Sequence, residues 1–334
     1  MEFCINKLSS QVLEPETIEV VEELIKIIKI NPELLSREED AREESREEPR
    51  EELREKEVRE PSISVDSAIA LIGKKQDRVR TGPNWVLVQD GHGYNDCIDF
   101  LDILPYDQIM QLENPAEEIQ RRIMASRESF VQSGSTLCIA RVIPGNVIEI
   151  INVGDSQAEV YIDGQLVFVS KPHGLTFAET ADPEELERVK PFLHPVTPSK
   201  SGKTLKAISP EIITQVENKV CNFRCGRSIV PTMVLGHENM TGFAPTKTYL
   251  PFSPGQRVRV CVYSDGVGDM RIENDAQDQA DMQTMTAQQL LDKFVGRWKK
   301  EWQFAPDEKR LDKLYPTTMS GGYDDVCIGI MDIV

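Results

Sequence analysis

Three aspartates stand at equivalent places in the sequence, each beside an apolar run that predicts a buried strand. They are Asp90 after the run 85–89, Asp265 after the run 258–264, and Asp324 just before the run 326–330. A rigid sheet fixes side chains at its strand ends closely enough for metal coordination. Glycine follows both Asp90 and Asp265 and lets the backbone turn sharply beside an ion. Carboxylate oxygens favour magnesium or manganese over zinc.

These aspartates belong to five short motifs that occur in a fixed order. The motifs are Asp90-Gly-His-Gly, Gly134-Ser-Thr-Leu, Val153-Gly-Asp-Ser, Ser264-Asp-Gly-Val-Gly-Asp and Gly322-Tyr-Asp-Asp-Val. Each alone is explained by a turn. Together, over residues 65–334, they resemble the metal-dependent protein phosphatases (PPM, type 2C). That resemblance implies hydrolysis of phosphoserine and phosphothreonine in proteins. It also implies an α+β fold, a central antiparallel β-sandwich flanked by helices on both sides.

The resemblance further implies two divalent cations, Mn²⁺ or Mg²⁺, in a cleft at one edge of the sheets. Asp90 would bridge both cations, Gly91 would give its backbone carbonyl to one of them, and Asp265 and Asp324 would bind the other. The pair would lower the pKa of a water molecule towards ~7 for direct attack on phosphorus.

Other positions match the family's motifs less closely. Asp77 matches the first acidic motif and should lie beside the cations. His92 matches the histidine that protonates the leaving oxygen, a contribution typically worth ~10²–10⁴ in rate. His173, His194 and His237 receive no catalytic role. Asp155 and Asp269 match a third, looser metal site of some family members.

The chain departs from the family pattern at four positions, namely Ile72, Gln76, Gln157 and His237. Ile72 replaces the usual phosphate-binding arginine, so the phosphate-binding residue is not identified. Lys74, Lys75 and Arg78 are the candidates, and a lysine lacks arginine's two-donor fork. These departures keep open the alternative of a weak or inactive pseudophosphatase that acts as an interaction scaffold. Retention of the three strand-end aspartates favours an enzyme.

Two other classes of protein lack their defining patterns. A calcium-binding loop needs alternating oxygen ligands, as in Asp-x-Asp-x-Asp-Gly, and the sequence contains none. A phosphotransferase with an aspartate nucleophile needs Asp-x-Asp after its first strand, where this chain has Asp90-Gly-His.

The amino-acid composition limits the classes of partner that the chain is expected to bind. The chain has 334 residues, a formal net charge of −18 and 40% hydrophobic residues. Such a charge argues against nucleic acid, because affinity for phosphate backbones comes from Lys and Arg. No apolar run approaches the ~18 residues that span a bilayer. We expect a soluble, intracellular monomer that acts on phosphoproteins, with no membrane association.

Seven scattered cysteines do not form the pattern of a secreted disulfide framework. Cys221 and Cys225 form a CxxxC pair, but a zinc site needs four ligands and no second pair accompanies them. We therefore expect buried, reduced cysteines. The surrounding stretch 200–227 has the irregular composition of an insertion and could influence substrate choice.

Composition divides the chain into three regions. Residues 1–36 contain an amphipathic helix at 17–29, which would pack on the main domain or dock on a partner. Residues 37–61 repeat Arg and Glu with a period of four and form a charged linker, because they offer almost nothing apolar to bury. Residues 62–334 form the phosphatase-like domain.

Within that domain, alternating and continuous apolar runs predict the secondary structure. Strands are expected at 85–89, 136–142, 147–153, 159–162, 165–169, 257–263 and 326–330. Helices are expected at 115–129, 183–190 and 286–302. Turns at Pro144-Gly145-Asn146 and Asp163-Gly164 predict hairpins between four of these strands.

Overall fold

The computed structural model describes most of the region after Glu60. The described residues are 61–174, 183–194, 200–209, 212–224, 226, 228–272, 275–300, 303–304, 315–316 and 323–334. The predicted helical region 1–36 and the charged linker, except for its last residue, lie outside them. Both remain predictions. Among the described residues, no helix is long and apolar enough to cross a membrane.

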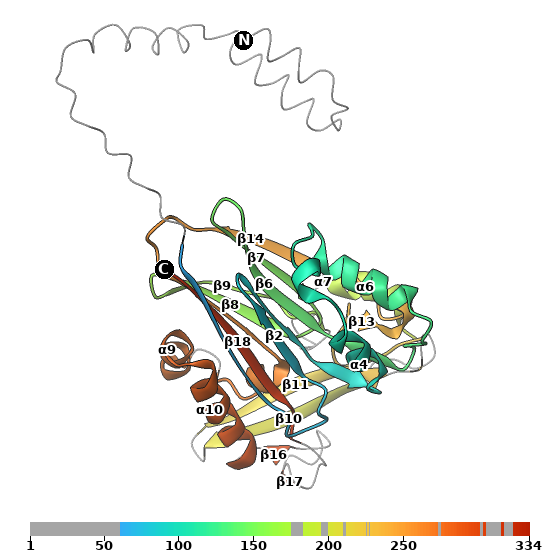
Figure 1. Ribbon diagram of the computed structural model, residues 1–334. Helices are drawn as coiled ribbons and strands as arrows, with labels where there is room; N and C mark the ends of the chain where they lie inside the picture. Colours follow the sequence, from blue (N-terminus) through green and yellow to red (C-terminus); the bar gives the residue numbers. More distant parts are fainter. Residues whose placement is uncertain are drawn as a thin grey trace, which may run out of the picture. The chain divides into compact units, whose positions relative to one another are not determined.

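Two five-stranded antiparallel sheets form the centre of the domain (Figure 1). The first sheet has the order β1 (Ile63–Ala70), β18 (Val326–Ile333), β15 (Val258–Tyr263), β8 (Gln157–Ile162) and β9 (Gln165–Val169). The second has the order β14 (Thr246–Pro251), β7 (Val147–Val153), β6 (Leu137–Ile143), β3 (Trp85–Gln89) and β2 (Arg78–Gly82).

The main core lies between the two sheets and is lined by β-branched and small residues. Val86 and Val88 of β3 face Val260 and Val262 of β15 in this layer. Strand residues alternate between faces, so Trp85 and Leu87 of β3 point to the opposite side. All five residues of β3 are buried because both faces of that strand are covered. This explains its continuous apolar sequence.

Helices cover the outer face of each sheet. The helices α4 (Asp96–Asp102), α5 (Tyr106–Ile109) and α6 (Pro115–Ala125) pack on the second sheet through one core cluster. The first sheet is covered by α10 (Ala287–Lys300), with α8 (Asp265–Gly268) and α9 (Ala276–Thr284) beside it. The layers are therefore helix, sheet, sheet, helix, and the predicted α+β sandwich with helices on both sides is confirmed.

Most predicted elements lie close to their expected bounds, and the differences have local causes. The strands 85–89, 147–153 and 165–169 have the predicted limits. The helix expected at 115–129 ends earlier, at Ala125, because Ser126 adopts an extended conformation with ψ 154°. The helices expected at 183–190 and 286–302 are α7 (Pro183–Val189) and α10. The prediction missed β1, β2 and β14, which are half-exposed edge strands with a weak apolar pattern.

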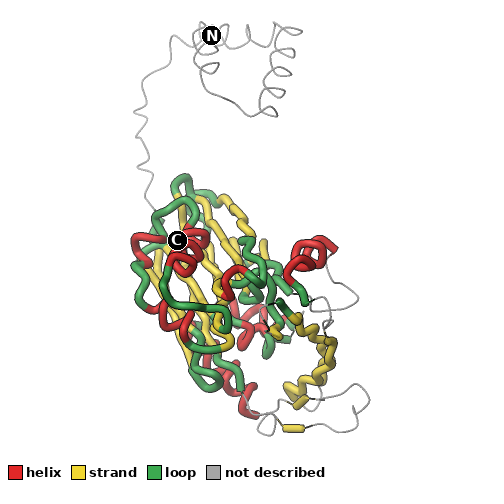
Figure 2. The backbone as a smooth tube through the Cα atoms, turned by 90° about the vertical axis from the view of Figure 1, so that its right-hand side faces the viewer, coloured by secondary structure: helices red, strands yellow, loops and turns green. Residues whose placement is uncertain are grey.

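The stretch 200–227 contains regular structure that its composition did not indicate. The strands β10 (Lys200–Ser209) and β11 (Ile212–Asn222) pair antiparallel, and β12 (Ser228–Ile229) extends the sheet. Figure 2 shows this sheet beside the main sandwich. Cys221 is buried in β11, and Cys225 lies outside the described residues.

Short elements complete the domain. They are β4 (Gly91–Gly93), β5 (Ser133–Ser135) and β13 (Leu235–Gly236) in one small sheet, β16 (Gln303–Phe304) paired with β17 (Tyr315–Pro316), and the 3₁₀ turns Lys190–Phe192 and His237–Asn239. The small sheet begins just after the end of β3, so it lies next to Asp90, which follows that strand.

Candidate metal centre

Asp90 is held where β3 ends and the small sheet begins. Its backbone amide donates to the hydroxyl of Thr136 at 3.0 Å, and its carbonyl accepts from the Thr136 amide at 2.9 Å. The Thr136 hydroxyl also contacts that of Ser156 at 2.6 Å. Gly91 lies against the preceding loop, where a Cβ atom would be 2.8 Å from Cβ of Gln76. A glycine is therefore required beside Asp90 for the loop to approach.

Asp265 is the first residue of α8 and is separated from the end of β15 by Ser264 alone. The strands β15 and β18 are tied here, since the Ser264 amide donates to the Cys327 carbonyl and the Cys327 amide to the Ser264 hydroxyl, both at 3.2 Å. Gly266 follows, and a Cβ atom there would lie 1.9 Å from the Asp325 carbonyl oxygen. The close approach of these two chain segments brings Asp265 towards Asp324.

Asp155 joins Asp90 and Asp265 in one cluster. Carboxylate oxygens of the three residues all lie within 4.8 Å of one another. Asp155 follows a turn at Gly154, whose φ of 89° suits glycine. His173 holds this turn: its ring Nδ1 accepts from the Gly154 amide at 3.3 Å, and its own amide donates to the Gly154 carbonyl at 2.8 Å. Asp155, assigned above only to a looser third site, thus belongs to the same cluster as Asp90 and Asp265.

Burial and mutual repulsion raise the pKa of each cluster carboxyl. Burial, with nearby carboxylates, raises the pKa of Asp77, Asp90 and Asp265 well above the usual range. Burial and the charges of Asp269 and Asp324 raise the pKa of Asp155 to about 7. One oxygen each of Asp77, Asp155 and Asp265 is buried without a hydrogen-bond partner. A cation would relieve both the repulsion and the missing contacts.

The loop 73–77 carries Asp77 and is fixed by a residue to which the sequence assigned no role. Asp325 is 1% exposed, and its carboxylate accepts from the backbone amides of Gly73 and Gln76, both at 2.7 Å. The Gln76 side chain donates to the Gly93 carbonyl at 3.0 Å and to Asn95 Oδ1 at 2.7 Å. Its amide group therefore ties the loop to β4 and does not extend the carboxylate set.

The three candidate basic residues of this loop differ in where they lie. Lys74 Nζ is 3.9 Å from Asp324 Oδ1. Partial desolvation at this edge of the cluster opposes its charge, yet the surrounding aspartates raise the pKa of Lys74. Arg78 instead pairs with Asp102 at 2.8 Å and donates to two loop carbonyls. Lys75 is exposed. Of the three, Lys74 is the one beside the aspartates.

His92 is 9% exposed and stacks on His237, with ring centroids 5.0 Å apart. His237 received no catalytic role in the sequence analysis, but the fold places it against the predicted proton donor. His237 belongs to a left-handed turn, with positive φ at Gly236, His237, Glu238 and Asn239. Left-handed backbone costs non-glycine residues roughly 1–2 kcal/mol each, and such strain is concentrated at functional sites. The sequence signal for this turn is only its Gly-His-Glu-Asn composition.

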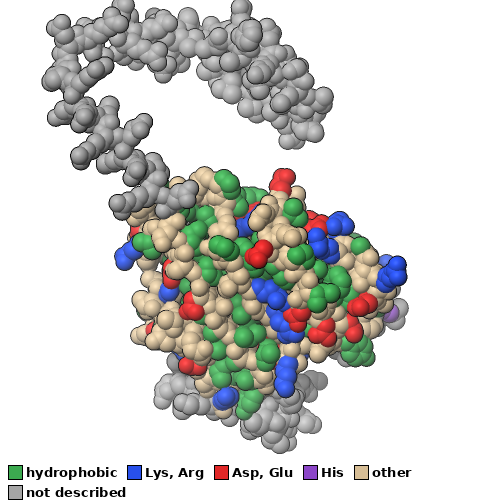
Figure 3. Space-filling view, viewed as in Figure 1, with side chains coloured by type: hydrophobic (Ala, Val, Ile, Leu, Met, Phe, Trp, Pro, Cys, Tyr) green, Lys and Arg blue, Asp and Glu red, His purple; other side chains and the backbone are tan. Residues whose placement is uncertain are grey.

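Asp269 lies one turn after Asp265 and donates its amide to the Asp265 carbonyl at 2.6 Å. Its charge contributes to the raised pKa of Asp155, Asp265 and Asp324. The fold thus brings together the predicted residues Asp77, Asp90, Asp155, Asp265, Asp269 and Asp324, which come from five separate segments. On the face seen in Figure 3, the described acidic and basic side chains are interspersed.

Comparison with known proteins adds information at the level of the fold. No protein-family model and no curated protein matches the sequence. The chain is similar to the solved structure of a C. elegans sex determining protein, with 17% identity and a TM-score of 0.50. The match covers 81% of this chain and 65% of that one, so the chain spans about two thirds of that protein's length.

Two bacterial structures are also similar. The Mycobacterium tuberculosis serine/threonine phosphatase PstP/Ppp has 18% identity and a TM-score of 0.48, with 81% of this chain and 98% of that chain covered. The PPM Ser-Thr phosphatase MsPP from Mycobacterium smegmatis has 16% identity and a TM-score of 0.44, with 80% and 97% covered. By their descriptions both are serine/threonine phosphatases, and the second is of the PPM type.

Proposed function

We propose that this chain is a metal-dependent protein phosphatase that hydrolyses phosphoserine and phosphothreonine in proteins. The observation that carries the proposal is the group formed by Asp90, Asp155 and Asp265, whose carboxylate oxygens lie within 4.8 Å of one another. Several carboxylate oxygens this close together suit a hard divalent cation, Mg²⁺ or Mn²⁺. The ordered motifs around these aspartates support phosphoester hydrolysis over other metal chemistry.

The residues present fit a pair of divalent cations. Asp77, Asp90, Asp265 and Asp324 would hold the pair, together with the Gly91 carbonyl. Asp155 and Asp269 would hold a further cation. The buried oxygens of Asp77, Asp155 and Asp265 that have no hydrogen-bond partner support this assignment. When bound, the cations would activate water as a nucleophile and neutralise charge on the phosphoryl group.

The chain's own residues would perform the remaining steps. The carboxylates would hold the cations that orient the attacking water towards the phosphorus. As the new P–O bond forms, the bond to the seryl or threonyl oxygen breaks, and His92 would give its proton to that oxygen. A proton from solvent would then restore His92. The stacked ring of His237 keeps one face of His92 out of water during this transfer.

A second candidate function is that of an inactive scaffold with the same fold. The side chain of Gln76 is committed to Gly93 and Asn95, so this loop supplies no second carboxylate. Lys74 adds a positive charge next to Asp324. Both features would weaken metal loading, and a protein that only binds a phosphoprotein partner tolerates that loss.

Hydrolysis of a phosphothreonine peptide tests the proposal. We expect turnover by the full chain with Mn²⁺ or Mg²⁺, none in excess EDTA, and none for Asp90→Ala or Asp265→Ala. The exposed Asp99→Ala is the matched control and should retain activity. Loss of His92 in His92→Asn should lower kcat by ~10²–10⁴. A folded protein that binds Mn²⁺ in calorimetry but shows no turnover would support the scaffold instead.

A further inference from the structure

Lys74 is built into the edge of the acidic cluster by the loop that carries it. Both amides that flank this part of the loop, those of Gly73 and Gln76, donate to the buried carboxylate of Asp325 at 2.7 Å. The Gln76 carbonyl in turn accepts from the Gly91 amide at 3.2 Å. The backbone of Lys74 is therefore held between the residues next to Asp324 and Asp90. The position of its side chain follows from the fold.

The ammonium group of Lys74 acts on the same carboxylates that would bind metal. Its nearest acidic atom is Asp324 Oδ1 at 3.9 Å. It interacts electrostatically with four aspartates, namely Asp324, Asp90, Asp265 and Asp77. The carboxylates of the cluster repel one another. A positive charge beside them reduces this repulsion, as a bound cation would.

The side chain is also free to leave. Lys74 is 60% exposed, whereas the Asp324 side chain is 21% exposed. A lysine has a flexible four-carbon stem and a strongly hydrated head, so moving it into solvent costs little. An ion pair that is partly exposed contributes modestly, and removing one partner should change an affinity by up to about five- to tenfold.

We propose that Lys74 is a tethered counter-ion that competes with a divalent cation for the Asp324 side of the cluster. Metal binding there requires the lysine to swing into solvent, and the competition sets how much metal the site holds at a given concentration. This inference rests on the proposed metal centre. It does not depend on turnover, because metal affinity can be measured without a substrate.

The test is calorimetric titration of the full chain with Mn²⁺ alone. We expect Lys74→Gln to bind Mn²⁺ about five- to tenfold more tightly than the unmodified chain, and Lys74→Arg to bind like the unmodified chain because it keeps the charge. Lys75→Gln is the matched control, since it removes the same charge from the neighbouring exposed residue. It should change the affinity less than twofold.

Each result decides the inference. If Lys74→Gln and Lys75→Gln change the Mn²⁺ affinity equally, the effect is one of net charge and the inference is overturned. An unchanged or weaker affinity in Lys74→Gln would also overturn it. If only Lys74→Gln binds Mn²⁺, the lysine blocks the site and the inference holds in its strongest form. If neither protein binds Mn²⁺, the metal centre itself is overturned, whereas tight binding without turnover overturns only the phosphatase activity.

Discussion

The imidazole rings of His92 and His237 stack at an interplanar angle of 27°. His237 is fixed from several sides. Its Nδ1–H donates to the Val131 carbonyl at 2.8 Å, and any side chain at Gly134 would place its Cβ 2.5 Å from Nε2 of the ring. The strained turn thus places the ring of His237 against one face of His92, the residue that we propose as the proton donor.

The strain in this turn is measurable by comparing two substitutions at Glu238, whose φ is 50°. Both Glu238→Gly and Glu238→Ala remove the contact with the Ser129 hydroxyl. Glycine adopts left-handed backbone freely, so the glycine variant should be more stable than the alanine variant by about 1 kcal/mol. Urea unfolding of the two proteins provides the comparison. Equal midpoints would mean that the turn relaxes at no cost.

Asp325 should be a major contributor to stability. Asp325→Ala leaves the amides of Gly73 and Gln76 without their charged acceptor, and we expect a loss of about 3 kcal/mol. Asp332→Ala is the control, because that carboxylate is 38% exposed in its pair with Arg259 and should cost under about 1 kcal/mol. Hydrogen exchange should accelerate at the two amides in the first variant only. Comparable losses in both variants would contradict the assigned role.

Asp77 should stabilise metal binding at the expense of the metal-free fold. Burial, together with Asp265 and Asp324, raises its pKa well above the usual range, so its charge is unfavourable without a cation. Asp77→Asn should raise the unfolding free energy in EDTA, because a neutral amide avoids the cost of burying a charge. The increase in Tm on adding Mn²⁺ should become smaller. A variant that is less stable in EDTA would show that Asp77 is a structural residue.

His173 should make the fold sensitive to acid. Burial lowers its pKa to about 4 from an ordinary value of 6.5, while Glu185 acts in the opposite direction. Between these values the unfolded chain binds a proton that the folded chain does not, so stability falls as pH decreases from 6.5 to 4. Unfolding of wild type and His173→Gln at several pH values gives the difference. Their stability gap should shrink by up to about 3 kcal/mol across this window, whereas a constant gap would contradict it.

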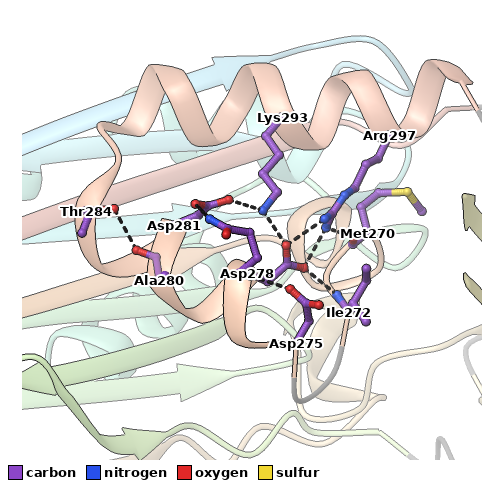
Figure 4. A network of polar contacts seen from close by, with 10 residues as sticks. Met270, Ile272, Asp275, Asp278, Ala280, Asp281, Thr284, Lys293 and Arg297 are labelled. Atoms are coloured by element: carbon purple, nitrogen blue, oxygen red, sulfur yellow. Dashed lines mark hydrogen bonds and ion pairs between the residues drawn. The ribbon is translucent and has the colours of Figure 1, made fainter.

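The ion-pair network between α9 and α10 should support the segment after Asp265 (Figure 4). Asp278 is fully buried and accepts from Lys293, from both terminal nitrogens of Arg297 and from the Ile272 amide. Asp278→Ala leaves two cations poorly paired and should cost about 3–5 kcal/mol. Asp281→Ala removes contacts to Lys293 and Gln277, but Lys293 keeps Asp278 as a partner, so the cost should be smaller, about 2 kcal/mol. Denaturant titration separates these values.

Arg297 also donates to the Met270 carbonyl at 2.8 Å, next to Asp269. The Asp278→Ala variant should therefore bind Mn²⁺ more weakly as well, while Asp281→Ala should bind it normally. Unchanged affinity in a destabilised Asp278→Ala protein would restrict the network to a role in stability.

The sequence by itself determined the sandwich and the aspartates at its strand ends. Runs such as 85–89 are apolar throughout because both faces of β3 are covered, and such a pattern is visible locally. Asp90 and Asp265 could be assigned because each closely follows its strand. The glycines after them mark close chain approaches, and those approaches occur at Gly91 and Gly266.

Tertiary structure alone decided the contacts that join distant segments. Asp325 meets Gly73 across 252 positions of sequence, and no local pattern encodes that pairing. The same holds for the position of Lys74 beside the aspartates, for the stacking of His237 on His92 and for the grouping of Asp155 with Asp90 and Asp265. Each depends on which backbone segments the two sheets bring together, whereas residue type and periodicity describe a segment only relative to its own neighbours.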